Sequence, residues 1–169
     1  MTPDLHRVYL SLGSNITPEK SLRKAVSLLG AHSALRACSS AWESRAVGSE
    51  GPNFLNACVL ITTPHDFQDL KKSVILPIEA ELGRSRSEDK NAPRTIDIDI
   101  LMMDDNPMGL ESWGRPFVVV PLAEIAPDLR HPSSAEPLSE LATRMRKQTW
   151  IKRRAGVLQR RIRDDGQQA

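Results

Sequence analysis

The chain has 169 residues, a mass of 18.8 kDa and a formal net charge of +2. This length suits one compact domain that needs no disulfide or zinc ion, and the 40% hydrophobic composition excludes a wholly disordered chain. No apolar run approaches the roughly 20 residues of a membrane helix, and residues 1–15 lack a signal-peptide pattern, so we expect a cytoplasmic protein. Cys38 and Cys58 are too few for a disulfide framework and too far apart for a CxxC site, so both are expected to be reduced and buried.

The charge is distributed unevenly along the chain. Residues 1–140 contain 14 Lys/Arg and 19 Asp/Glu, whereas residues 141–169 contain 9 and 2. We therefore predict a domain over residues 1–140 and a basic C-terminal extension over 141–169. Aromatic residues make up only 4% of the chain, which does not favour nucleic acid as the main partner. A nucleic-acid-binding domain that uses the basic extension stays open as an alternative, and the sequence does not indicate an oligomeric state.

The first half of the chain alternates strand and helix signals. Val8, Leu10 and Leu12 alternate with polar residues and predict a strand over 7–13, and Thr17 and Pro18 are typical of a helix start. The patterns that follow predict a helix to residue 30, strands over 35–42 and 54–63, and a helix from Asp66 to residue 82 with a kink at Pro77.

The second half begins with a polar loop over 84–93 and a strand over 94–103. Residues 117–120 form a short apolar run before a helical turn over 121–125, and residues 138–163 are predicted to be helical. The order β-α-β-β-α-β predicts an α+β, ferredoxin-like fold, with an antiparallel sheet, helices on one face and a C-terminal helical extension.

The segment 93–100, PRTIDIDI, carries the most specific chemical signal. Alternate residues of a strand share a face, so Asp97 and Asp99 lie together, about 7 Å apart at their Cα atoms, opposite a row of isoleucines. Two like charges side by side cost stability unless a cation binds between them, and Mg²⁺ prefers such carboxylate oxygens. The alternative is an amphipathic strand whose outward face carries two solvated aspartates.

Arginines surround this strand in the sequence. Arg84, Arg86 and Arg94 bracket the polar loop that leads into it, and Arg115 follows it. Arginine binds phosphate oxygens with several donors at once, so the set together with the aspartates predicts a site for a nucleoside triphosphate and Mg²⁺. Each arginine alone could instead solvate a loop. The chain has no Walker A motif, so side chains must hold the nucleotide.

The sequence resembles the 6-hydroxymethyl-7,8-dihydropterin pyrophosphokinase family of folate synthesis over about residues 7–130. The resemblance rests on the PRTIDIDI segment and, in the family's order, on GSN at 13–15, FLNA at 54–57, GRSR at 83–86 and PLAEIAPDL at 121–129. It implies transfer of the terminal pyrophosphoryl group of ATP to the pterin hydroxymethyl oxygen, with release of AMP.

The resemblance also implies roles for single residues. Asp97 and Asp99 would bind two Mg²⁺ ions and, with Arg94, form the catalytic set. The residues that match ATP-binding positions of the family are Glu79, Arg84, Arg86, Arg94, Ile100 and Arg115.

For the pterin, Phe54 and Phe117 would stack on the two faces of the ring, and Asn56 would pair with its polar edge. Backbone groups at Ser44 and Val47 would complete this site. A flat heteroaromatic ring gains from such stacking, although both phenylalanines could instead belong to the core.

The chain departs from the family pattern at three places. The segment 102–115 is shorter than in the family and contains no histidine. Asn91 stands where the family has a tryptophan, and Leu76 stands where it has a glutamine. Trp113 is a candidate replacement for the missing aromatic contact. These differences leave open a paralogue that acts on a related pterin, or a non-catalytic binder of pterin or nucleotide.

Overall fold

An antiparallel β-sheet forms the centre of the protein in the computed structural model, which describes residues 4–48, 50–84 and 94–162. Four strands lie in its middle in the order β5, β1, β4, β2, with bounds β1 (His6–Ser14), β2 (Ala34–Cys38), β4 (Phe54–Thr63) and β5 (Asp97–Met103). Short strands extend the sheet, namely β3 (Ala41–Ser44) beside β4, β6 (Asn106–Pro107) beside β5, β7 (Ile151–Arg154) beside β3 and β8 (Arg161–Ile162) beside β2. The described strand pairs are antiparallel, as predicted.

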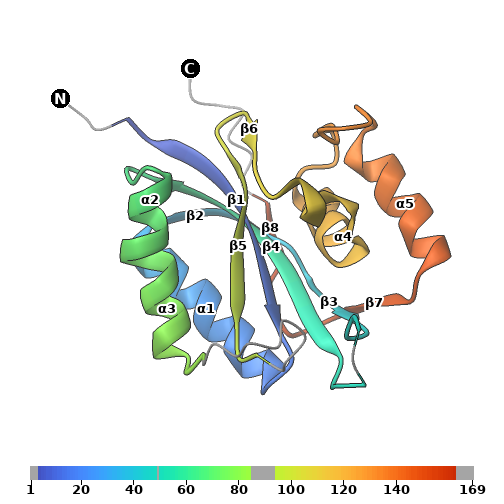
Figure 1. The fold of residues 1–169 in the computed structure, drawn as a ribbon, viewed down its shortest axis with the longest axis horizontal. Coiled ribbons are helices and arrows are strands. Elements are labelled where there is room, and N and C mark those ends of the chain that lie inside the picture. The colour runs from blue at the N-terminus through green and yellow to red at the C-terminus, as the bar shows by residue number, and fades with distance from the viewer. Residues whose placement is uncertain (1–3, 49, 85–93, 163–169) are drawn as a thin grey trace.

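Helices cover both faces of this sheet (Figure 1). One face carries α1 (Pro18–His32) and a continuous helical segment of α2 (Phe67–Leu70), η1 (Lys71–Ile75) and α3 (Leu76–Glu81). The other face carries α4 (Pro116–Ile125) and α5 (Leu138–Gln148). The two helices of the predicted β-α-β-β-α-β order therefore share one face, whereas α4 and α5 add a second helical layer on the other face. Strand β4 explains why, because Val59 belongs to one hydrophobic cluster and Leu60 to the other, so each face needs a cover.

The predicted elements of the first 82 residues are largely confirmed. Val8, Leu10 and Leu12 of β1 are fully buried, and β4 has the predicted bounds. Helix α1 begins at Pro18 after Thr17, although the Thr17 side chain makes no capping hydrogen bond. Asp66 does cap its helix, because its Oδ1 accepts a hydrogen bond of 2.9 Å from the Asp69 backbone N–H.

The predicted strand over 35–42 is split into β2 and β3 at Ser39 and Ser40. Glu124 of α4 holds this break, since its carboxylate accepts hydrogen bonds from the backbone N–H and the hydroxyl of Ser40 and from Trp42 Nε1, over 2.8–3.2 Å. Arg160 adds an ion pair of 3.3 Å. One largely buried carboxylate therefore ties α4 and the C-terminal segment to the sheet.

The kink predicted at Pro77 appears as a π-helical turn just before it, over Lys71–Ile75. Proline has no N–H to donate and its ring crowds the preceding turn, so the helix widens there and resumes at Leu76–Glu81. Gly83 ends the helix with a φ of 80°, which a residue with a Cβ adopts only at a cost.

The C-terminal third differs most from the prediction. Helix α4 includes residues 117–120 as well as the predicted turn over 121–125, because Pro116 starts the helix and Val118–Val120 are buried there. The helix predicted over 138–163 ends at Gln148, and the residues after it form β7 and β8, so the extension is helical only in part. The predicted boundary between residues 140 and 141 falls within α5. None of the described helices has both the length and the apolar character needed to cross a membrane.

Strand β5 begins at Asp97, three residues later than predicted, and contains a β-bulge. Ile96, Ile98 and Ile100 belong to the core beneath α1, as the alternation predicts. The bulge falls at Leu101, since Leu10 pairs with Ile100 and the preceding residue of β1, Tyr9, pairs with Met102. The two aspartates precede this irregularity and therefore share one face.

Candidate active site

A cavity of about 300 Å³ opens where β1, β3, β4 and β5 meet the start of α4. Its wall contains nine of the predicted site residues, which are far apart in the sequence. They are Ser44, Val47, Phe54, Asn56, Arg94, Asp97, Asp99, Arg115 and Phe117. The predicted carboxylate pair, two of the arginines and the aromatic pair therefore share one cavity.

Three of the other predicted site residues, Glu79, Arg84 and Ile100, are not part of the cavity wall. Ile100 is buried in the hydrophobic core, and Arg86 lies outside the described residues. Glu79 and Arg84 do not line the cavity, but an ion pair joins them and Arg84 continues the contact to Asp97. These two residues therefore reach the site through Asp97.

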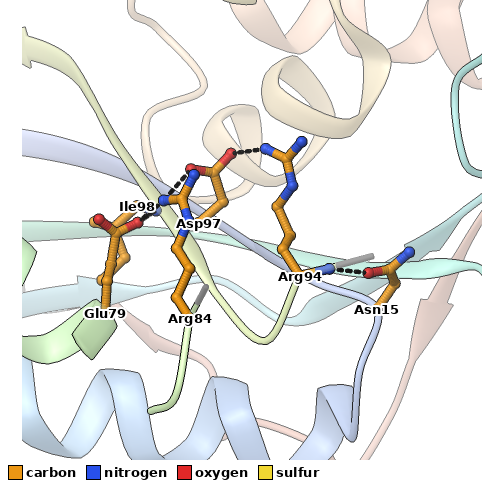
Figure 2. A network of polar contacts seen from close by, with 6 residues as sticks. All are labelled: Asn15, Glu79, Arg84, Arg94, Asp97 and Ile98. Atoms are coloured by element: carbon orange, nitrogen blue, oxygen red, sulfur yellow. Dashed lines mark hydrogen bonds and ion pairs between the residues drawn. The ribbon is translucent and has the colours of Figure 1, made fainter. Parts of the chain in front are cut away.

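Asp97 is held by two arginines, one at each carboxylate oxygen (Figure 2). Arg84 Nη1 lies 3.0 Å from Oδ1 and Arg94 Nη1 lies 2.9 Å from Oδ2. Both guanidinium groups are about one-fifth exposed, which makes these ion pairs stronger than pairs in open solvent. The Asp97 carboxylate is thus fixed in position and neutralised by the chain's own cations.

Glu79 supports this arrangement through its contact with Arg84. It is a buried carboxylate, 4% exposed, and its Oε2 accepts a hydrogen bond from the backbone N–H of Ile98 at 3.2 Å as well as one from Arg84 (Figure 2). Loss of solvent raises the pKa of Glu79, and Arg84 opposes that rise. Glu79 therefore fixes both Arg84 and the strand between the two aspartates.

Asp99 has a different environment. No hydrogen bond or ion pair is found for its side chain among the described residues. Loss of solvent around the carboxylate, and then the negative charges of Asp97 and Glu79, raise its pKa from 3.8 to about 6. A carboxylate whose charge is this unfavourable gains from the arrival of a cation.

The donor set suits a hard divalent cation. Within the described part of the chain no group of three or more His, Cys, Asp or Glu side chains is placed to hold a metal. Mg²⁺, however, commonly takes one or two carboxylates from the protein and completes its coordination with water and phosphate oxygens. Asp97 and Asp99, on one face and in the wall of one cavity, fit that requirement.

The opposite side of the cavity is built around Asn56, which is 3% exposed. Its Nδ2 donates hydrogen bonds of 3.0 Å to the Trp42 carbonyl and 2.8 Å to Ser44 Oγ, so the orientation of the amide is fixed. Gly13 pairs with Asn56 across β1 and β4, and a Cβ at Gly13 would lie 3.4 Å from Asn56 Oδ1. The glycine therefore keeps the space beside this amide open.

A comparison with known proteins assigns the family. The family model described as 7,8-dihydro-6-hydroxymethylpterin-pyrophosphokinase (HPPK) matches residues 9–127. The chain belongs to the HPPK family. It is 35% identical to the 2-amino-4-hydroxy-6-hydroxymethyldihydropteridine pyrophosphokinase of Synechocystis over 80% of this chain and 74% of that protein. It is 36% identical to the protein of that name from Bacillus subtilis, with coverages of 83% and 90%, and 40% identical to that from Methylorubrum extorquens, with coverages of 73% and 84%.

A solved structure supports the fold. A Plasmodium falciparum crystal structure, described as HPPK-DHPS wild type with STZ-DHP, matches with a TM-score of 0.63 over 87% of this chain. The sequence identity is 13%, so this likeness concerns the fold alone, and the match covers 42% of the Plasmodium chain. The resemblance of the sequence to HPPK is confirmed by the family model and by these relatives.

Asn15 supports the candidate site through Arg94, a contact that the sequence reasoning missed. Its Oδ1 accepts a hydrogen bond of 2.8 Å from the backbone N–H of Arg94, its own backbone N–H donates 3.1 Å to the Arg94 carbonyl, and its Nδ2 donates 3.3 Å to the Pro52 carbonyl. Asn15 is buried and joins the end of β1 to the segment that carries Arg94 (Figure 2). The signal was the GSN turn, which was recognised as a motif but without this contact.

Arg45, Glu111 and Ser112 also line the cavity and were not predicted. Glu111 and Ser112 lie on η2 (Leu110–Gly114), inside the segment that has fewer residues than in the family. Trp113 of the same turn is not available as a replacement aromatic contact, because it is fully buried and its Nε1 donates to the Met108 carbonyl at 3.1 Å. Its ring also packs edge-on against His131, with the ring centroids 6.1 Å apart.

Proposed function

We propose that this protein transfers the pyrophosphoryl group of ATP to the hydroxymethyl oxygen of 6-hydroxymethyl-7,8-dihydropterin and releases AMP. The observation that carries the proposal is the single cavity in which Asp97, Asp99 and Arg94 face the same space as Asn56 and Phe54. Membership of the HPPK family supports the same reaction, because its curated relatives are named as pyrophosphokinases of this pterin.

The pterin end of the cavity is suited to a flat ring with a polar edge. We assign Phe54 and Phe117 to its faces, Asn56 to its edge, and the backbone at Ser44 and Val47 to the remaining contacts. The hydrogen bonds that fix the Asn56 amide before any ligand arrives reduce the entropy lost on binding.

The phosphate end is suited to a polyanion. We assign Arg84, Arg86, Arg94 and Arg115 to the triphosphate, with Glu79 holding Arg84 in place and the backbone at Ile100 near the nucleotide. Asp97 and Asp99 would hold Mg²⁺, in two ions by the family resemblance. Bound Mg²⁺ supplies charge neutralisation on the phosphates, as it does generally in phosphoryl transfer.

In the proposed reaction the hydroxymethyl oxygen attacks the β-phosphorus of ATP. The bond from this phosphorus to the α–β bridging oxygen breaks, AMP leaves with that oxygen, and the hydroxyl proton passes to water. The chain's own contribution is to hold the two substrates in line and to place guanidinium groups where negative charge develops.

The remaining expectations extend this proposal. The strand order β5, β1, β4, β2 with helical crossovers supports the ferredoxin-like topology for the central strands. We propose a cytoplasmic protein with a catalytic domain over residues 1–140 and a basic extension over 141–169, for which nucleic acid is not the partner.

The test is an incubation with Mg²⁺, ATP and 6-hydroxymethyl-7,8-dihydropterin, followed by separation of nucleotides and pterins. We expect AMP and pterin diphosphate in equal amounts, and none when EDTA replaces Mg²⁺. Asp97→Asn should abolish the reaction. Asp105→Asn should leave it unchanged, because Asp105 is an exposed aspartate of the β5–β6 turn outside the cavity. Intact ATP in the wild-type reaction would instead support the altered-substrate or non-catalytic alternative.

A further inference from the structure

The strand β7 lies outside the residues matched by the family model, yet it pairs with β3, whose Ser44 lines the cavity. The family match ends at residue 127, whereas β7 spans Ile151–Arg154 and pairs along the whole of β3 (Figure 1). On its other side, β3 pairs with β4, where Trp42 is opposite Asn56 and Ser44 is opposite Phe54. The position of β3 in the sheet therefore depends on β7 as well as on β4.

Two polar contacts add to this pairing. Arg154 of β7 forms an ion pair of 2.8 Å with Glu43 of β3. The guanidinium of Arg146, on α5, lies 5.0 Å from the ring centroid of Trp42. The C-terminal residues thus contact β3 through its backbone and through two side chains.

The contact nearest the cavity is between Arg45 and Trp150. Ser44 pairs with Ile151, so the antiparallel register, continued by one residue, places Trp150 opposite Arg45. The guanidinium carbon of Arg45 lies 5.4 Å from the centroid of the Trp150 ring, within the range of a cation–π interaction. Trp150 is 41% exposed, which is unusual for so large an apolar side chain unless it serves a contact of this kind.

Arg45 lies in the wall of the substrate cavity, beside Ser44 and Val47. A second cavity of about 380 Å³ is lined by Trp150 and its neighbours and shares five wall residues with the first, namely Ser44, Arg45, Val47, Arg115 and Phe117. Trp150 therefore touches the outer side of the wall whose inner side faces the substrate. In the sheet, β1 and β4 separate β3 from β5, so this wall is at the pterin end rather than at the carboxylate pair.

We propose that Trp150 is a positioning residue that holds Arg45 in the wall of the cavity and thereby raises the affinity for the pterin. The inference rests on the proposed function for the identity of the ligand. Without the indole ring, Arg45 gains rotamer freedom and must be ordered again when the ligand binds. The loss should appear in pterin binding and not in nucleotide binding.

The experiment measures two dissociation constants by calorimetry, that of an ATP analogue with a methylene α–β bridge and that of the pterin in the presence of this analogue and Mg²⁺. An exposed cation–π contact is worth enough to change binding about two- to fivefold, so Trp150→Ala should raise the pterin Kd by that factor. The Kd of the analogue should stay unchanged. Trp150→Phe keeps an aromatic face and should restore most of the affinity.

A double-mutant cycle separates positioning from general damage. Arg45→Ala should weaken pterin binding at least as much as Trp150→Ala, and the double variant should bind no more weakly than Arg45→Ala alone. Lys152→Ala is the matched control, since Lys152 is an exposed residue of β7, two positions from Trp150, and this variant should bind as the wild type does. Equal loss of analogue and pterin binding, full additivity with Arg45→Ala, or no effect of Trp150→Ala would each overturn the inference. Because these are binding measurements, absence of AMP formation in the wild type would contradict the proposed function alone.

Discussion

Replacement of Asp99 by asparagine should make the metal-free protein more stable while abolishing its activity. The pKa of Asp99 is raised from 3.8 to about 6 in the folded chain. This shift means that the ionised carboxylate lowers the free energy of unfolding by at most roughly 3 kcal/mol. Part of the Asp99 side chain still faces the water of the cavity, which screens some of this unfavourable interaction, so we expect a gain in stability of about 1 kcal/mol. For a chain of this size that difference raises Tm by about 2–4 °C.

The pH dependence follows from the direction of the shift. Because the pKa is higher in the folded than in the unfolded chain, the folded protein binds the extra proton as the pH falls from about 6 to about 4, and its stability rises there. Above about pH 6 the unfavourable charge is fully present. The advantage of Asp99→Asn should therefore be largest at pH 7–8 and should shrink on acidification through this window.

Urea unfolding in EDTA from pH 4.5 to 8, followed by circular dichroism, measures this difference. Asp105→Asn is again the matched control and should show no such pH-dependent gain. The argument that the ionised Asp99 destabilises the fold would be refuted if Asp99→Asn were less stable than the wild type at pH 7.5. It would also be refuted if the gain in the free energy of unfolding were the same at every pH.

Three further predictions concern the scaffold. Glu124→Ala removes the acceptor of Ser40 and Trp42 and should lower the free energy of unfolding by about 2–4 kcal/mol in urea titrations, whereas wild-type stability would contradict its anchoring role. Asn15→Ala releases the Arg94 backbone and should lower kcat/KM about tenfold or more in steady-state assays run well below the Tm of the variant. Burial raises the pKa of Cys38 to about 11, and that of Cys58 rises further. Thiol reagents at pH 8 should therefore label both cysteines only as fast as the chain unfolds, and rapid labelling of the native protein would argue against this burial.

The sequence was most informative where local pattern and burial agree. The alternation of Asp97 and Asp99 with isoleucines and the Asp66 cap depend on residues close together in the chain, and these features were predicted correctly. The convergence of Phe54, Asn56 and Phe117 on the same cavity was implied only by the family resemblance, because spacing along the chain does not bring β4 and α4 together.

The failures have a common physical origin in tertiary contacts. The apolar run over 117–120 was not recognised as the start of the helix that follows it, because valine has a low helix propensity and only burial against the sheet favours the helix there. Residues 151–154 follow a helical pattern, yet an open edge at β3 binds them as a strand. Arg45 could not be recognised as a wall residue without this pairing, and the burial of Trp113 could not be read from its position in a polar segment.

The two arginines that pair with Asp97 link the binding of nucleotide to the binding of metal. Arg84 and Arg94 serve as internal counterions to this carboxylate. If a triphosphate recruits these arginines, as we propose, Asp97 loses its two cations and should bind Mg²⁺ more tightly than it does in the absence of nucleotide. By thermodynamic reciprocity, Mg²⁺ should then tighten nucleotide binding by the same factor, and we expect the metal–nucleotide complex to bind better than either component alone.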